Sequence, residues 1–136
     1  MPFPGERVQP SMLLVEDDAD DRRFLEWAMR RCGLAVQLST ARDGEEAIEF
    51  LSHSPERLFL TLSDVHLPKK SGWDVLQWIR RQPACARMPV LIWTSLPNPE
   101  GELRAQQLGA TSYFSKPLTA EGYRKLVGVI EEYLHD

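Results

Sequence analysis

Five residues that can do chemistry stand at or just after the ends of short apolar runs. The acids Glu16 and Asp17 follow MLLV, Asp64 follows LFLTLS, Thr94 ends PVLIWT, and Lys116 follows TSYFS. Carboxylates can bind a divalent cation, and a hydroxyl and an ammonium can bind the oxygens of a phosphoryl group. Their repeated position at the ends of apolar runs predicts that the fold brings them together.

Glu16, Asp17 and Asp64 would form a cluster of like charges if they met. Carboxylates about 4 Å apart repel by roughly 4 kcal/mol per pair at an effective dielectric of 20, so a cluster needs a cation or shifted pKa values. Hard oxygen ligands favour Mg²⁺, which keeps several waters and takes one or two carboxylates together with phosphate oxygens. The sequence therefore predicts a Mg²⁺ site at these acids.

Asp64 is the candidate nucleophile of this group. A carboxylate that attacks phosphorus forms an aspartyl phosphate, and a metal ion, a hydroxyl and an ammonium can offset the charge. Thr94 offers the hydroxyl, and Lys116 offers a positive charge that can pair first with a carboxylate and then with a phosphoryl group. We therefore predict that the protein accepts a phosphoryl group on Asp64.

Each of these residues has a simpler interpretation when it is taken alone. Asp17 or Asp18 at a helix start is more often a cap than a metal ligand, and an acid before a turn, such as Asp64, is usually turn chemistry. Thr94 could be a strand-end hydroxyl bonded to backbone, and Lys116 a solvated surface lysine. Their joint position favours the chemical interpretation, and we assign only Asp18 as a helix cap.

The elements that must position these residues alternate between short apolar runs and longer amphipathic stretches, which is typical of βα units. Strands are predicted over residues 12–16, 35–40, 58–63, 89–94 and 111–115. Helices are predicted to begin at the capping residues Asp18, Asp43 and Ser71, after the SLPNPE segment, and at the start of an apolar stripe from Tyr123 to Leu134.

Five strands, each followed by a helix, predict a doubly wound α/β fold of (βα)5 type. Right-handed crossovers make the sheet parallel and place helices on both of its faces. The flavodoxin-like strand order 2-1-3-4-5 is a common solution for five strands, with a ligand site at the switch point beyond the carboxyl ends of strands 1 and 3. Glu16, Asp17 and Asp64 would meet in that crevice.

Composition predicts one globular domain and excludes several classes of protein. The chain has 136 residues, of which 43% are hydrophobic and 26% charged, enough for one core and too few for two. Its formal net charge of −4 and the scattered Lys and Arg residues argue against nucleic acid as a partner. We interpret residues 1–10 as a flexible N-terminal tail and residues 11–136 as the domain.

Cysteine spacing and hydropathy predict a cytoplasmic protein. Cys32 and Cys85 stand far apart without CxxC spacing, so neither a disulfide framework nor a zinc site is indicated. No segment has the length of a membrane span, and the N-terminus lacks the apolar region of a signal peptide.

Four motifs extend this interpretation, because LLVEDD, SDVHLPKKSGWDVL, PVLIWTS and GATSYFSKPLT stand in order over residues 11–135. In these four motifs and their order, the chain resembles the receiver domains of two-component response regulators, in particular single-domain regulators of the chemotaxis type. The resemblance implies that Glu16 and Asp17 are the acid pair, with Asp17 the direct Mg²⁺ ligand and Glu16 reaching the metal through water. It also implies that Asp64 is the phosphoacceptor.

The same resemblance assigns roles to the remaining site residues. His66 would complete the metal shell through its backbone carbonyl, Thr94 would be the switch hydroxyl, and Tyr113 the switch aromatic, although Tyr113 could also be a static edge-strand residue. Lys116 would bind the phosphoryl group, and the Lys116–Pro117 peptide bond would be cis.

The resemblance also implies partners. A sensor histidine kinase would donate the phosphoryl group, and EDD, LPKKSGW and TS are similar to the short regulators served by phytochrome-type kinases. Because the sequence ends with the fifth helix, we expect the signal to pass to another protein through the fourth helix, fifth strand and fifth helix, with Arg104, Tyr123 and Tyr133 as candidate contact residues. A homodimer is also compatible with this. The protein would catalyse only its own phosphorylation and dephosphorylation, so it would not be an enzyme acting on an external substrate.

Other functions remain open from sequence. A receiver-like adaptor that works independently of phosphorylation would keep the fold without the chemistry. The presence of every residue needed for phosphorylation argues against it. A phosphatase of the haloacid dehalogenase type needs a DxD motif, and His66 stands where its second Asp should be. A flavodoxin needs a Ser/Thr- and Gly-rich phosphate loop after the first strand, which this sequence lacks.

Overall fold

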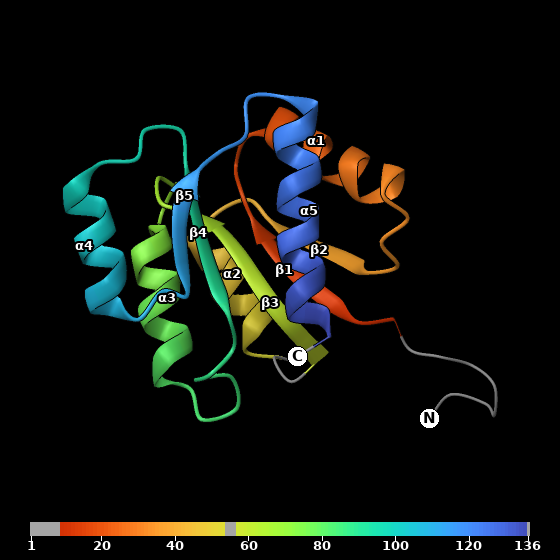
Figure 1. Ribbon diagram of the computed structural model, residues 1–136. Coiled ribbons are helices and arrows are strands. Elements are labelled where there is room, and N and C mark those ends of the chain that lie inside the picture. The colour runs from red at the N-terminus through yellow and green to blue at the C-terminus, as the bar shows by residue number, and fades with distance from the viewer. Residues whose placement is uncertain (1–8, 54–56, 136) are drawn as a thin grey trace, which may run out of the picture.

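The computed structural model of the 136-residue chain describes residues 9–53 and 57–135 (Figure 1). Residues 1–8 of the predicted N-terminal tail lie outside the described residues, and the first strand begins at Ser11. Among the described residues, no helix is long and apolar enough to cross a bilayer.

Strands and helices alternate along the chain, as the sequence predicts. The strands are β1 (Ser11–Val15), β2 (Gln37–Ala41), β3 (Leu58–Asp64), β4 (Val90–Thr94) and β5 (Ser112–Ser115). The helices are α1 (Ala19–Arg31), α2 (Gly44–Leu51), α3 (Gly72–Arg81), α4 (Pro99–Leu108) and α5 (Ala120–Leu134). All neighbouring strands pair in parallel in the order β2-β1-β3-β4-β5, so the predicted flavodoxin-like topology is confirmed.

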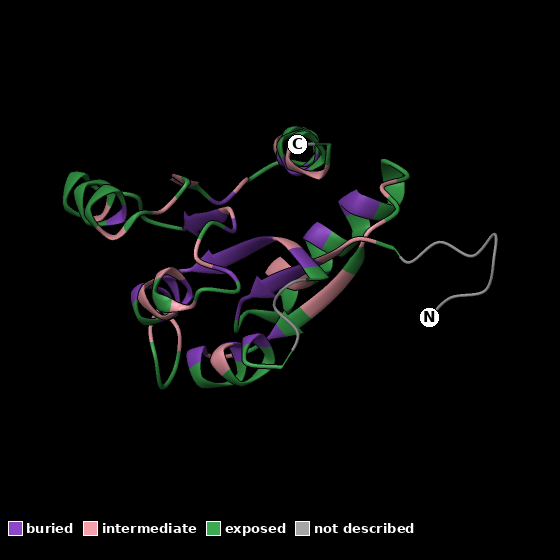
Figure 2. Ribbon diagram, turned by 90° about the horizontal axis from the view of Figure 1, so that it is seen from below, coloured by how far each residue is buried: buried purple, intermediate pink, exposed green. Residues whose placement is uncertain are grey.

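The helices cover both faces of the sheet (Figure 1). Seen along the sheet in Figure 2, α2 and α3 lie below it and α5 lies above it. Successive strand side chains point to opposite faces, so each central strand contributes to two cores. One core lies beneath α1 and α5 and includes Leu14 and Trp93, and the other lies beneath α2 and α3 and includes Leu13 and Ile92.

Capping residues fix where the helices begin, and therefore how the loops above the sheet run. The Asp18 carboxylate accepts the backbone N–H groups of the second and third residues after it, and the Asp43 carboxylate at the start of α2 accepts the N–H of the third residue after it. Ser71 and Asp74 form a reciprocal capping box at the start of α3. These caps confirm the three helix starts that the sequence marked.

Two sequence predictions are wrong. The Lys116–Pro117 bond is trans, and no peptide bond in residues 9–53 and 57–135 is cis. The trans isomer is intrinsically favoured even before proline. Tyr123 is not an exposed contact residue, since it is 6% exposed and packs edge-on against Trp93 in the core beneath α5. Arg104, by contrast, is exposed on α4.

Candidate functional site

The carboxyl ends of four strands bring the predicted site residues together. Glu16 follows β1, Asp64 ends β3, Thr94 ends β4 and Lys116 follows β5. Strand register aligns them, because Val15 pairs with Ser63 and Thr94 pairs with Ser115. The backbone N–H of Lys116 donates to the carbonyl of Thr94 over 2.8 Å, which extends the ladder to the lysine.

Lys116 is the electrostatic centre of the site. Its Nζ lies 2.8 Å from Glu16 Oε1, 3.0 Å from Asp64 Oδ2 and 2.8 Å from Asp21 Oδ2. Its side chain is only 9% exposed. One ammonium therefore holds three carboxylates from three different elements in place.

Burial shifts the acid–base equilibria of this group. Burial, together with the nearby charge of Asp64, raises the pKa of Glu16 to about 7, although the hydrogen bond with Lys116 opposes the rise. Burial by itself would lower the pKa of Lys116, but its bonds to the three carboxylates outweigh this and raise the pKa. Lys116 thus stays charged at neutral pH.

Three acids are grouped closely enough to hold a metal ion. Glu16, Asp17 and Asp64 each offer a carboxylate oxygen, and these oxygens lie within 4.8 Å of one another. Glu16 is fully buried and Asp17 is exposed, so the cluster runs from the interior to solvent. An all-oxygen donor set that is open to water on one side fits Mg²⁺ or Mn²⁺.

The backbone after β3 holds Asp64 in a fixed orientation. The N–H of His66 donates to Asp64 Oδ1 over 3.3 Å, while Oδ2 faces Lys116. A Cβ on Gly72 would come within 2.0 Å of the Asp64 carbonyl oxygen, so only glycine lets the start of α3 pack this closely. The predicted metal contact of the His66 carbonyl stays a prediction.

Thr94 and Tyr113 lie on the side of the site nearest α4. Thr94 is buried, and its Oγ1 accepts the N–H of Leu96 over 3.3 Å. Tyr113 is half-buried, its ring stacks on Trp73 with a centroid distance of 6.4 Å, and its hydroxyl accepts the N–H of Asn98 over 3.2 Å. Both residues line one cavity of about 210 Å³, which leaves room for side-chain movement.

Asp21 is the site contact that sequence reasoning missed. It lies in the first turn of α1, where acids interact favourably with the helix dipole whether or not they reach a site. The sequence signal that could have placed it beside the cluster is its position in the first turn of the helix that Asp18 caps, because that helix begins at the carboxyl end of the first strand, where Glu16 and Asp17 lie.

The fold and the acid cluster first define a class: a flavodoxin-like α/β domain with a group of carboxylates at its switch point that is close enough to hold a cation. The model of the response regulator receiver domain matches residues 12–128. The chain therefore belongs to the receiver domain family of two-component response regulators.

Similar proteins include short regulators and larger proteins. Response regulator Rcp1 of Synechocystis sp. is 32% identical over 127 residues, covering 90% of this chain and 86% of Rcp1. A probable chemotaxis protein CheY of Rhizobium etli is 29% identical, with 88% and 90% covered. A probable cyclic di-GMP phosphodiesterase of Vibrio cholerae is 32% identical over 111 residues, which are 82% of this chain and only 24% of that protein.

Solved structures agree in fold. The phosphorylated cyanobacterial phytochrome response regulator RcpA superposes with a TM-score of 0.82 at 29% identity, covering 93% of this chain and 94% of RcpA. The Mn(2+)-bound form of Rcp1 superposes with a TM-score of 0.79 at 31% identity, covering 92% and 94%. One similar protein has thus been seen phosphorylated and another with a divalent ion.

Proposed function

We propose that the protein is a response regulator that accepts a phosphoryl group on Asp64 from a sensor histidine kinase. The observation that carries the proposal is the Asp64 carboxylate itself. It is 6% exposed, sits at the end of β3, and has one oxygen held 3.0 Å from the Lys116 ammonium inside a cluster of acids. Turn geometry alone does not require a carboxylate to be buried beside an ammonium and two other acids, because burial of a charge is costly.

In the proposed reaction, an Asp64 oxygen attacks phosphorus, the bond from phosphorus to the donor imidazole nitrogen breaks, and an aspartyl phosphate forms. Lys116 stays protonated and pairs with a phosphoryl oxygen, and the Thr94 hydroxyl donates to another. Asp17 and Asp64, with the His66 carbonyl, would hold Mg²⁺ directly, and Glu16 would reach it through water. When bound, the ion supplies positive charge that offsets the gathering anions.

The proposed output is a change of surface around Thr94 and Tyr113. The movement of Thr94 toward the phosphoryl group would leave its cavity free for Tyr113, and α4, β5 and α5 would be reshaped as a binding surface for a downstream protein. A groove of about 410 Å³ between β5 and α5 supports the proposal that a partner binds there, and Phe114, Leu126 and Val129 are among its lining residues.

For the donor, we propose a kinase of the phytochrome class, because RcpA is described as a phytochrome response regulator and covers nearly the whole chain. We place the exchange in the cytoplasm, where the free thiols of Cys32 and Cys85 would stay reduced. The protein would modify only itself and turn over no external substrate.

Acetyl phosphate with Mg²⁺ tests the chemistry without the kinase. We expect the intact mass to increase by one phosphoryl group in the wild type and in Asp20→Asn, an exposed-acid control on α1, but not in Asp64→Asn. An unmodified wild type that also fails to bind beryllofluoride with Mg²⁺ would contradict the proposal. It would instead favour an adaptor that works independently of phosphorylation.

A further inference from the structure

The first turn of α1 contains a carboxylate to which the proposed reaction gives no role. Asp21 Oδ2 lies 2.8 Å from Lys116 Nζ, closer than the 3.0 Å between Lys116 and the phosphoacceptor candidate Asp64. The Asp21 side chain is 24% exposed, so this ion pair is largely shielded from water. The contact joins α1 to the residue that follows β5.

We infer that Asp21 is a positioning residue, which anchors the Lys116 ammonium from the α1 side so that one of its N–H groups is free to turn to a phosphoryl oxygen. This inference rests on the proposed function of Asp64. An ammonium has three N–H donors, and Glu16, Asp21 and Asp64 each lie within 3.0 Å of it. The hydrogen bonds from Nζ go to Asp21 and Asp64, while Glu16 Oε1 is an ion-pair contact. Once an Asp64 oxygen is bonded to phosphorus, the bond to Asp21 still holds the ammonium, and another N–H can point at the phosphoryl group.

Helix capping does not explain the orientation of Asp21. Asp18 Oδ1 already accepts the N–H groups of Asp20 and Asp21, at 2.9 and 3.0 Å. The Asp20 side chain points to solvent, where it pairs at 3.6 Å with the exposed Arg23. Of the two first-turn acids, Asp21 is therefore the one that reaches the site, and Asp20 offers a control of equal charge on the same turn.

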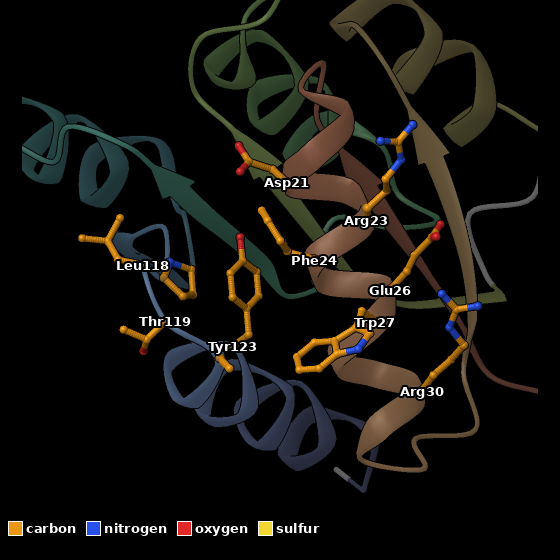
Figure 3. A pocket seen from close by; sticks show the side chains of 11 residues that line it. Asp21, Arg23, Phe24, Glu26, Trp27, Arg30, Leu118, Thr119 and Tyr123 are labelled. Atoms are coloured by element: carbon orange, nitrogen blue, oxygen red, sulfur yellow. The ribbon is translucent and has the colours of Figure 1, made fainter.

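Asp21 also separates Lys116 from a groove. A groove of about 740 Å³ lies between α1 and the start of α5, lined by Asp21, Phe24, Leu118 and Tyr123 among others. Figure 3 shows the rings of Phe24 and Tyr123 turned toward each other across this groove, with Asp21 at one end of it. Truncation of Asp21 would remove an acceptor and also open Lys116 to water, whereas Asn would keep both the bulk and an acceptor oxygen.

Binding of beryllofluoride, a phosphoryl mimic, in the presence of Mg²⁺ measures this role in the full chain. Tryptophan fluorescence can follow it, since Lys116 Nζ lies 5.5 Å from the centroid of the Trp93 ring. Relative to Asp20→Ala, we expect Asp21→Ala to weaken beryllofluoride binding about tenfold and Asp21→Asn to fall between the two. Mg²⁺ affinity without beryllofluoride should stay within about threefold of the Asp20→Ala value, because Asp21 is not in the metal cluster.

The outcomes separate positioning from other roles. Asp21→Ala binding beryllofluoride as well as Asp20→Ala does would overturn the inference alone. Tighter binding by both Asp21→Ala and Asp21→Asn would also overturn it, since Asp21 would then act only by repelling the anion. A wild type that binds no beryllofluoride would overturn the proposed function together with this inference. If thermal melting shows that Asp21→Ala does not fold, the beryllofluoride affinity of Asp21→Asn is compared with that of Asp20→Asn instead. We then expect Asp21→Asn to bind about threefold more weakly.

Discussion

At the scale of single residues, the site contains more carboxylates than the single ammonium of Lys116 can neutralise. Glu16, Asp21 and Asp64 surround Lys116, and Asp17 adds a fourth carboxylate on the solvent side. Part of the charge imbalance is relieved by the raised pKa of Glu16, and a divalent cation would relieve the rest. Stability, metal binding and phosphoryl chemistry should therefore depend on the same few charges.

Removal of the lysine should destabilise the metal-free protein. Lys116→Met leaves its carboxylates unpaired in a largely buried setting, and we expect a loss of about 3 kcal/mol in the free energy of unfolding in EDTA. Urea unfolding measures this, with Lys125→Met, an exposed lysine on α5, as the control. Mg²⁺ should restore part of the loss. Equal stability of the two variants in EDTA would contradict the central role of Lys116.

Glu16 should make the metal-free protein lose stability as pH rises. Its pKa is about 7 in the folded chain against an ordinary value of 4.5, so the unfolded chain releases this proton first. Its stabilising contribution is fully present below about pH 4.5 and is lost as pH rises to about 7 and beyond. In EDTA, Glu16→Gln should therefore gain stability over the wild type at pH 8 but not at pH 4.5.

Urea unfolding at a series of pH values measures this difference. Glu45→Gln, which removes an exposed acid in the first turn of α2, is the control and should follow the wild type. A Glu16→Gln variant with the same pH dependence as Glu45→Gln would show that Glu16 ionises normally.

At the scale of elements, the strand ends place the chemistry and the loops set its geometry. Gly72 is an example in the loop before α3. Its backbone N–H donates to the Val65 carbonyl over 2.9 Å, and its lack of a side chain leaves room for the Asp64 carbonyl. The glycine in the motif SGWDVL is thus a packing requirement of the start of α3. It ties the orientation of α3 to that of the candidate phosphoacceptor.

Alanine at Gly72 should be costly, while alanine at Gly128 should not be. The Gly72 Cβ would overlap backbone atoms, and we expect a loss of about 2 kcal/mol or more, together with slower phosphorylation by acetyl phosphate. Gly128 lies within α5 with no atom within 4 Å of an added Cβ, so Gly128→Ala should gain about 0.5–1 kcal/mol through helix propensity. Thermal unfolding of both variants measures the contrast, and equal effects would contradict this account of Gly72.

Sequence reasoning was accurate where the physical pattern is local. Apolar runs predicted the strands within a few residues, and Asp18, Asp43 and Ser71 marked three helix starts because capping depends on neighbours in the chain. It failed where the outcome depends on distant packing. The contact of Asp21 with Lys116 spans 95 positions, and the burial of Tyr123 depends on how α5 lies across the sheet.

At the scale of the whole molecule, the site and the proposed output surface share β4 and β5. Thr94 and Lys116 stand at the ends of these strands, and Tyr113 within β5 packs between Trp73 and the start of α4. A Cβ on Gly101 of α4 would come within 2.4 Å of the Tyr113 hydroxyl oxygen, so the ring position and the helix position depend on each other. A change at Asp64 can thus reach α4 through a short chain of packed groups.

Beryllofluoride with Mg²⁺ should therefore change amide chemical shifts mainly on one side of the molecule. We expect the largest changes outside the site in residues 98–119 and at the surface of α5, and small changes in α2, which contacts β2 at the edge of the sheet opposite β5. Heteronuclear NMR measures this, with Asp64→Asn as the control that should not respond. Light scattering on the same samples would show whether a homodimer forms. Unchanged shifts throughout residues 98–135 would contradict the proposed output route.

The most direct test of the central claim is to locate the phosphoryl group on the chain. The protein is treated with acetyl phosphate and Mg²⁺ and then with borohydride, which reduces an acyl phosphate and leaves homoserine in place of aspartate, and the digested peptides are sequenced by mass spectrometry. We expect homoserine at position 64 and unmodified Glu16, Asp17 and Asp21. Homoserine at another aspartate, with Asp64 intact, would contradict it.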